Sequence, residues 1–227
     1  MNAASTHEDD RRLADALGAA EASTRLKAAL AIGTRPGDGF ADVLVARCAV
    51  EPDFFVRDML TWALTRLPRE VTVPRLVAEL TSERAQARSQ ALHTLSKIGD
   101  AGAWPAVTVA LLRDGDDEVA RAAWRAAVVL VPDGGRAALA AELGTQLGRG
   151  DREVQLSLSR SLAALGEIVE PVLRAAAAHP DARVRAHAAA TERLLRDPDS
   201  AFEPDLNAAR RVDALGRERE ERLRADR

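Results

Sequence analysis

The stretch from Ala87 to Val131 decides the fold, because it holds one helix-turn-helix unit and the opening of the next. It reads ARSQALHTLSKIG, DAGAWPAVTVALLRDGDDE and VARAAWRAAVVLV in succession, with Arg88 and Arg121 in equivalent places. The same template recurs along the chain, and each unit is numbered here from the residue equivalent to Arg88. These zero positions, 30 to 34 residues apart, are Arg25, Arg57, Arg88, Arg121, Gln155 and Arg185. A period of this length predicts a helical repeat array.

The second helix of each unit carries apolar residues at offsets -1, +3, +7 and +10 from the zero position, which is one stripe at the helical period. Offset +11 holds a helix-breaking residue in five of the six units, so we expect these helices to end at the same point. The five residues are Pro36, Pro68, Gly99, Pro132 and Gly166.

Acidic residues precede the zero position by four in five units, where their side chains are expected to cap the second helix. They are Glu21, Asp53, Asp117, Asp151 and Asp181, with Arg84 as the exception. Prolines are expected near the start of three first helices, where a missing N–H costs nothing. These are Pro74, Pro105 and Pro171.

The predicted fold is all-α: a right-handed α-solenoid of about six helix pairs followed by a charged C-terminal helix. Hydrophobic residues make up 47% of the 227 residues but aromatics only 3%, so the core is expected to consist of Ala, Leu and Val. A repeat array grows end to end and needs no second core, which makes one elongated domain the default. The expected boundaries are a disordered tail at 1–5, the array at 6–196, a loop at 197–204 and the charged helix at 205–227. That last helix either folds back over the final unit, which we favour because its apolar stripe is short, or projects toward a partner.

Charge is nearly balanced, with 32 basic and 35 acidic residues, which argues against nonspecific nucleic-acid binding without excluding a local basic groove. Cys48 is the only cysteine and is expected to be buried, so no intramolecular disulfide can form. The N-terminus lacks the pattern of a signal peptide and no apolar run reaches membrane-spanning length. A cytoplasmic protein with no membrane contact is therefore expected, and its oligomeric state stays open.

The residues resemble a HEAT-repeat protein of the short-repeat type first noted in phycobilisome lyase-like sequences. The resemblance rests on an acid followed by Val-Arg and an Ala/Leu-rich helix, as in DFFVRDMLTWALTRLP from Asp53 and DARVRAHAAATERLL from Asp181. It covers roughly residues 6 to 196. The central stretch is also similar to segments found downstream of MerR-type DNA-binding domains in actinobacterial regulators. No such DNA-binding module is evident here, so a role in transcriptional regulation would be exerted through a partner.

In HEAT arrays the second helices line the concave surface, and their outward offsets are roughly +1, +5, +8 and +9. An exposed Trp flanked by His and Arg on neighbouring helices would suit a protein partner, because Trp and Arg dominate binding energetics. The competing interpretation is that Trp62 packs against its neighbours and the charges form a solvated face. The predicted partner-binding face comprises Asp58, Trp62, Arg66, Ser89, His93, Lys97, Arg160 and Arg193.

The sequence therefore favours a non-enzymatic interaction scaffold or adaptor, without cofactor or metal. His179 and His187 flank Asp181, but no further ligand pair accompanies them. Trp104 and Trp124 are expected in or near the core. The alternative is an enzyme: HEAT-like alkylpurine DNA glycosylases hold a damaged nucleotide with a Trp and an acid in a basic groove, and Asp58 and Trp62 are four residues apart. A bilin lyase-like activity is the other enzymatic possibility that the resemblance implies.

Overall fold

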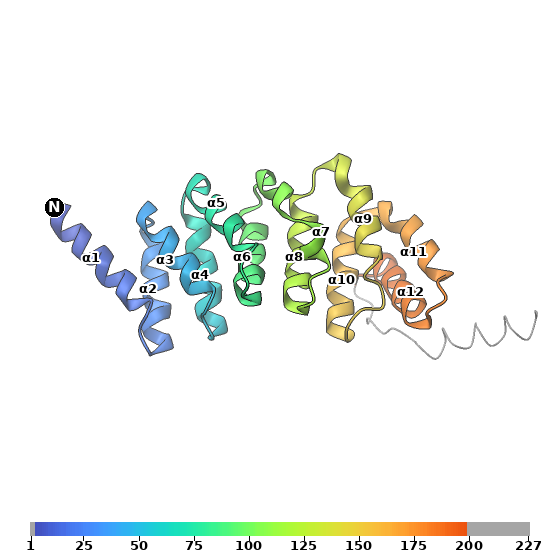
Figure 1. Ribbon diagram of the computed structural model, residues 1–227, viewed down its shortest axis with the longest axis horizontal. Coiled ribbons are helices and arrows are strands. Elements are labelled where there is room, and N and C mark those ends of the chain that lie inside the picture. The colour runs from blue at the N-terminus through green and yellow to red at the C-terminus, as the bar shows by residue number, and fades with distance from the viewer. Residues whose placement is uncertain (1–2, 199–227) are drawn as a thin grey trace, which may run out of the picture. The chain divides into compact units, whose positions relative to one another are not determined.

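The computed structural model describes residues 3–198, and within that range the chain is helical without a β-strand (Figure 1). Contacts between residues divide the chain into two compact units, Met1–Leu130 and Val131–Arg227. The expected charged helix at 205–227 lies outside the described residues. The all-α, paired-helix prediction is confirmed.

The first unit contains four helix pairs. Their second helices, α2, α4, α6 and α8, pack against one another in chain order, and the first helices lie beside them. The elements are α1 (Ala3–Ala16), α2 (Ala22–Thr34), η1 (Asp38–Phe40), α3 (Ala41–Cys48), α4 (Phe54–Arg66), α5 (Arg69–Glu79), α6 (Ala85–Ile98), η2 (Ala101–Ala106), α7 (Val109–Leu112) and α8 (Asp117–Leu130).

The second unit contains two helix pairs, in which α9 packs on α11 and α10 packs on α12. Its elements are η3 (Asp133–Gly135), α9 (Arg136–Gly144), α10 (Arg152–Ala164), η4 (Gly166–Val169), α11 (Glu170–Ala177) and α12 (Ala182–Arg196). The described residues thus hold six helix pairs, as the repeat predicts.

The second helices end where the sequence predicts. In five of the six helix pairs, the last residue of the second helix lies one or two positions before the Pro or Gly at offset +11. Gly99 and Gly166 have φ of 68° and 75°, a left-handed conformation that residues with a Cβ rarely adopt. These glycines end the helix by backbone geometry, whereas the prolines do so because they lack an N–H.

The helix starts agree with the sequence only in part. Asp53, Asp151 and Asp181 each accept a backbone N–H from the first turn of the following helix, as predicted. Glu21 makes no such bond, because its longer side chain suits the N-cap poorly. The predicted cap at Asp117 is also wrong. Asp117 is the first residue of α8, and Asp116 caps the helix by accepting from the N–H groups of Glu118 and Val119.

Two of the three first-helix prolines also differ from the prediction. Pro74 lies inside α5, because that helix begins directly after Pro68. Pro105 lies in the 3-10 turn η2, and the α-helix proper starts only after Thr108, whose hydroxyl accepts from the N–H of Leu111. Pro171 does lie in the first turn of its helix. The first helix of the fourth pair is short as a result.

The N-terminal helix also begins earlier than the sequence predicts. A tail at 1–5 and an array from residue 6 are expected from the sequence, but α1 begins at Ala3. Alanine has the highest helix propensity of all residues, which favours a helix that includes Ala3 and Ala4.

The arginine at the zero position fixes the start of its own helix to the connector before it. In four of the six helix pairs, Nη1 of this arginine donates to the backbone carbonyls five and six residues earlier, at distances of 2.6 to 3.2 Å. We call this contact the connector clamp, and it is made by Arg25, Arg57, Arg88 and Arg185. Gln155 reaches one of the two equivalent carbonyls, that of Gly150. Arg121 makes neither contact and pairs instead with Glu118 at 2.8 Å.

Two of the clamping arginines also reach a carboxylate in the next helix pair. Arg25 donates to both oxygens of the fully buried Glu51 at 2.7 Å, and Arg88 likewise binds Asp114. Glu51 also accepts from Nε of Arg47 and from the N–H of Asp53. Burial raises the pKa of the Glu51 carboxyl, but the arginine hydrogen bonds outweigh it and lower the pKa to about 2. Glu51 therefore stays ionised at neutral pH.

The remaining core predictions are confirmed. Trp124 is fully buried, and its indole N–H donates to the carbonyl of Leu112 at 2.8 Å. Cys48 is buried, and Trp104 is half-buried. Ala, Leu and Val make up most of the buried apolar residues, as the low aromatic content requires.

His187 forms the polar centre of the second unit. It is fully buried in α12, its Nδ1 accepts the N–H of Gly148 at 2.9 Å, and its Nε2 lies 3.0 Å from the carbonyl of Gln155. Because a carbonyl can only accept, Nε2 carries the proton of a neutral imidazole. Burial lowers the pKa of His187 to about 4.

We predict that Glu51→Ala costs about 3 to 5 kcal/mol of unfolding free energy, because it leaves two arginines without their partner in a buried site. Urea denaturation at pH 7 measures the loss. The control is Glu192→Ala, which removes an exposed pair with Arg196 and should cost less than about 1 kcal/mol. Equal losses in the two variants would contradict the prediction.

We predict that His187 makes the second unit acid-sensitive. The folded pKa is lower than that of the unfolded chain, so unfolding takes up a proton between pH 6.5 and pH 4. Stability should be fully present above pH 6.5 and fall by about 3 kcal/mol as the pH drops to 4. Urea denaturation at several pH values would show this fall reduced in His187→Gln and kept in His179→Gln. Identical pH profiles for the wild type and His187→Gln would refute it.

Candidate functional site

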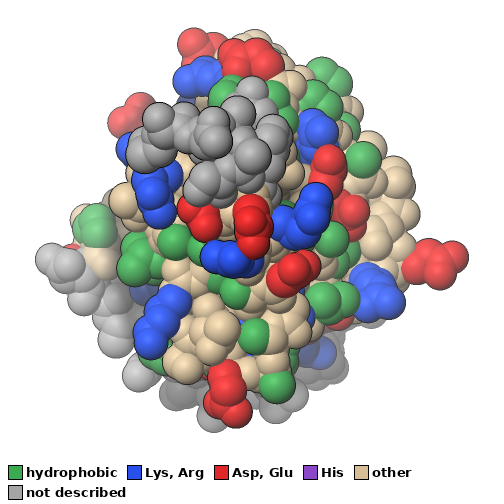
Figure 2. Space-filling view, turned by 90° about the vertical axis from the view of Figure 1, so that its left-hand side faces the viewer, with side chains coloured by type: hydrophobic (Ala, Val, Ile, Leu, Met, Phe, Trp, Pro, Cys, Tyr) green, Lys and Arg blue, Asp and Glu red, His purple; other side chains and the backbone are tan. Residues whose placement is uncertain are grey.

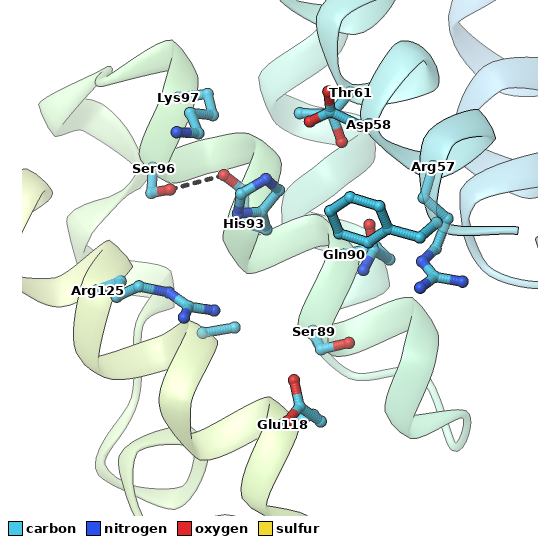
Figure 3. Close-up of a pocket in the computed structure, with 12 residues that line it drawn as sticks. Arg57, Asp58, Thr61, Ser89, Gln90, His93, Ser96, Lys97, Glu118 and Arg125 are labelled. Atoms are coloured by element: carbon cyan, nitrogen blue, oxygen red, sulfur yellow. Dashed lines mark hydrogen bonds between the residues drawn. The ribbon is translucent and has the colours of Figure 1, made fainter. Parts of the chain in front are cut away.

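A cavity of about 430 Å³ opens between three consecutive second helices of the first unit, α4, α6 and α8 (Figure 3). Each helix contributes polar side chains that point toward a common space. The lining residues are Phe54, Arg57, Asp58 and Thr61 from α4, Ser89, Gln90, His93, Ser96 and Lys97 from α6, and Glu118, Ala122 and Arg125 from α8.

A second cavity of about 250 Å³ continues the first. It is lined in part by the same residues, Arg57, Ser89, Gln90 and Glu118, and adds Ala85, Gln86 and Asp116. We call the two together the α4–α6–α8 groove. Along α6 it runs from Ala85 to Lys97, a length of about 18 Å at 1.5 Å per residue. This is long enough for a short peptide segment.

The helical repeat explains why these residues meet. On α6, Ser89, His93 and Lys97 are four residues apart and so share one side of the helix. Arg57 and Arg88 hold α4 and α6 to their connectors in the same way, so equivalent offsets on the two helices lie at similar levels. Thr61 and Thr94, 3.4 Å apart, join the two helices beneath the groove.

His93 lies half-buried in the groove between charges from all three helices. Burial, Lys97 of its own helix and Arg125 of α8 lower its pKa, while Asp58 of α4 opposes them. The imidazole is therefore neutral at pH 7. Ser96 donates to the backbone carbonyl of His93 and not to the ring (Figure 3).

Phe54 and Phe55 form an exposed aromatic pair at the groove. They are 65% and 71% exposed, and their rings meet edge-to-face with centroids 5.6 Å apart. The guanidinium of Arg57 lies 6.0 Å from the centroid of the Phe54 ring, within reach of a cation–π contact. Neighbouring aromatics at this exposure mark a binding surface better than a folding core.

Four of the eight residues predicted for the partner-binding face line this groove: Asp58, Ser89, His93 and Lys97. Ser89 is buried and donates to the carbonyl of Gln86, so it contributes to the floor. Arg66 is exposed near the end of α4 and is not among the lining residues. Arg160 and Arg193 are exposed on α10 and α12 of the second unit.

Trp62 lies outside the groove and packs against helix α2. A Cβ atom added at Gly33 would overlap the six-membered ring of Trp62, so the glycine makes room for it. Trp62 as a whole residue remains 37% exposed. Of the two residues on which the glycosylase hypothesis depends, Asp58 lines the groove and Trp62 does not.

His179 and His187 each make their own hydrogen bonds and do not share a ligand site. His187 is held by Gly148, whereas Nδ1 of the exposed His179 accepts the N–H of Asp181. Among residues 3–198, no cluster of three His, Cys, Asp or Glu side chains is arranged to hold a metal ion. No helix in the same range is long and apolar enough to cross a bilayer.

The sequence pattern missed Phe54 and Phe55. The available signal was their position: they follow the capping Asp53 at offsets -3 and -2, which the apolar stripe does not use. The chain has only four Phe, so two adjacent ones off the stripe were informative.

No known protein family matches the chain, and no curated protein matches its sequence. Several solved structures are similar. One engineered protein from a structural genomics consortium is 24% identical, with a TM-score of 0.47 and coverage of 86% of this chain and 96% of that one. A second engineered protein is 20% identical, with a TM-score of 0.47 and coverage of 88% and 100%.

The third similar structure is the complex of CpcE and CpcF of phycocyanin lyase from Nostoc sp. PCC7120. The matched chain is 20% identical, with a TM-score of 0.49 and coverage of 82% of this chain and 76% of that one.

We predict that His93 titrates below pH 6.5 in the free protein. Lys97→Ala and Arg125→Ala each remove a nearby positive charge and should raise the pKa of His93. Asp58→Asn removes a negative charge and should lower that pKa further. NMR titration of the imidazole carbon-bound protons measures each midpoint, with Arg66→Ala as the control that should leave it unchanged. A wild-type midpoint at or above 6.5 would show that the groove does not have this electrostatic environment.

Proposed function

We propose that the protein is a non-enzymatic interaction scaffold that binds a segment of a partner protein in the α4–α6–α8 groove. The observation that carries the proposal is the exposed pair Phe54–Phe55 beside a preformed cavity. The two rings pack edge-to-face on each other, which reduces the side-chain entropy lost on binding, and Phe is among the residues enriched at interface cores.

The hydroxyl groups in the groove support binding over catalysis. The Oγ atoms of Ser89 and Ser96 donate to backbone carbonyls, those of Gln86 and His93. A serine nucleophile would need its hydroxyl paired with a base such as the His93 ring. The absence of enzymatic activity stays a prediction.

The charge distribution supports a protein partner over nucleic acid. Acidic Asp58, Asp116 and Glu118 line the groove together with its cations, and each would repel a phosphate backbone. Figure 2 shows a similar mixture on the face drawn there, where basic and acidic side chains are interspersed. A cytoplasmic location, and any regulatory role exerted through the partner, belong to the same proposal.

The test is affinity capture of the tagged full chain, after chemical cross-linking in the cells that produce it. We expect a discrete protein partner whose recovery falls at least about tenfold in Phe54→Ala/Phe55→Ala, as for the loss of an interface hot spot. The matched control, Val109→Ala on α7, removes an exposed apolar side chain outside the groove and should leave recovery unchanged. Full recovery by the double variant, with unchanged helical circular dichroism, would contradict the proposal.

A further inference from the structure

Two cations lie at one end of the groove without a direct ion pair within residues 3–198, although Glu118 and Asp58 are near enough to act on Arg125 and His93 through their charge. Lys97 on α6 and Arg125 on α8 both line the cavity and both lower the pKa of His93 between them, so their charges lie close together. Within residues 3–198, neither side chain makes a hydrogen bond or an ion pair. Both are exposed and accessible to a ligand.

Arg121, one helical turn before Arg125, adds to this positive field. It is the zero-position arginine that makes no connector clamp, because the cap of α8 is Asp116, five residues before it instead of four. Its Nε is buried without a hydrogen-bond partner, and its charge lowers the pKa of Arg125 further after the larger effect of desolvation. Arg121 does not line the groove and is paired with Glu118, so it acts on the groove only through its charge on Arg125.

The opposite end of the groove carries two carboxylates and one cation, Arg57. Asp116 and Glu118 lie at the start of α8, and Glu118 is partly neutralised by Arg121. A carboxylate at the Lys97–Arg125 end gains two cations and is opposed there by one acid, Asp58, whereas Asp116 and Glu118 lie at the other end. A nucleic-acid backbone lying along the groove would place phosphates at both ends, and those near Asp116 and Glu118 would be repelled.

The lengths fit a short extended segment. The α6 residues of the larger cavity run from Ser89 to Lys97, about 12 Å along the helix, which an extended chain covers in about four residues. Phe54 lines the same cavity. In a bound peptide, the apolar residue that contacts Phe54 would therefore lie three or four positions from the acidic residue that binds Lys97 and Arg125.

We propose that the partner segment is an acidic peptide whose carboxylate binds between Lys97, Arg125 and His93 while an apolar side chain of the same peptide contacts Phe54. This inference rests on the proposed function and gives its partner a chemical class. Lys97 and Arg125 supply charge, and protonation of His93 adds a second N–H donor and a third positive charge.

Binding of the carboxylate opposes the effect of the two cations on His93. The pKa of His93 should rise on binding, so affinity should increase from pH 8 to pH 6. The charged and titratable groups facing His93 are Asp58 from α4, Lys97 from α6 and Arg125 from α8. Asp58→Asn removes the acid among them and should strengthen binding of the same peptide.

The experiment titrates the full chain with two matched peptides, acetyl-Phe-Ser-Ser-Glu-Glu-Ser-amide and its Gln-Gln counterpart, and follows the His93 imidazole signals by NMR. We expect the Glu-Glu peptide to bind about tenfold more tightly and to raise the His93 midpoint. Lys97→Glu and Arg125→Glu should each abolish the preference. Arg66→Glu, the same charge change on an exposed helix position outside the groove, should keep it.

Equal binding of the two peptides, or an unchanged His93 midpoint with bound peptide, would overturn the proposal. Tighter binding of a single-stranded thymidine decamer than of the acidic peptide would overturn it in favour of nucleic acid. Cellular capture separates the two levels of inference. Loss of the partner in Phe54→Ala/Phe55→Ala but not in Lys97→Glu would contradict the carboxylate site alone, whereas retention in both variants would contradict the scaffold function as well.

Discussion

The connector clamp is the contact on which the rest of the structure depends. A helix leaves its first N–H groups unpaired, and the connector before it presents carbonyls that need donors. One arginine at the zero position serves these carbonyls from the second turn of the helix, so the direction of each connector is fixed relative to the helix that follows. The guanidinium groups of Arg25 and Arg88 each also bind a carboxylate of the next helix pair, which couples neighbouring helix pairs.

The groove follows from this constraint and from one departure from it. Because the clamped helices α4 and α6 repeat the same orientation, their outward offsets face a common space, and a cavity forms where these two helices meet α8, whose Arg121 makes no clamp. In the fourth pair the connector cap moves by one residue, and Arg121 turns to Glu118. The groove therefore includes one of the two helix pairs in which the zero-position residue does not make the full connector clamp.

Much of this architecture could be predicted from the sequence. The period, the apolar stripe and the Pro or Gly at offset +11 each have a local physical cause, and together they locate the second helices. Asp58, His93 and Lys97 followed from the outward offsets that the resemblance to HEAT arrays implies. The shifted cap at Asp116 could not be predicted, because a spacing that varies between 30 and 34 residues hides a one-residue change in a connector. The position of Trp62 depended on Gly33 of a neighbouring helix, a missing side chain that no pattern within α4 reveals.

Hydrogen exchange of backbone amides in the wild type and in Arg88→Met tests the central claim most directly. Arg88 binds the carbonyls of Ser82 and Glu83 and the carboxylate of Asp114. If the clamp holds the array, the amides of the connectors at 81–84 and 113–116 should exchange faster in the variant, while those in the middle of α6 keep their protection. Unchanged exchange in both connectors would show that the helices keep their arrangement without the arginine, and the account would be wrong.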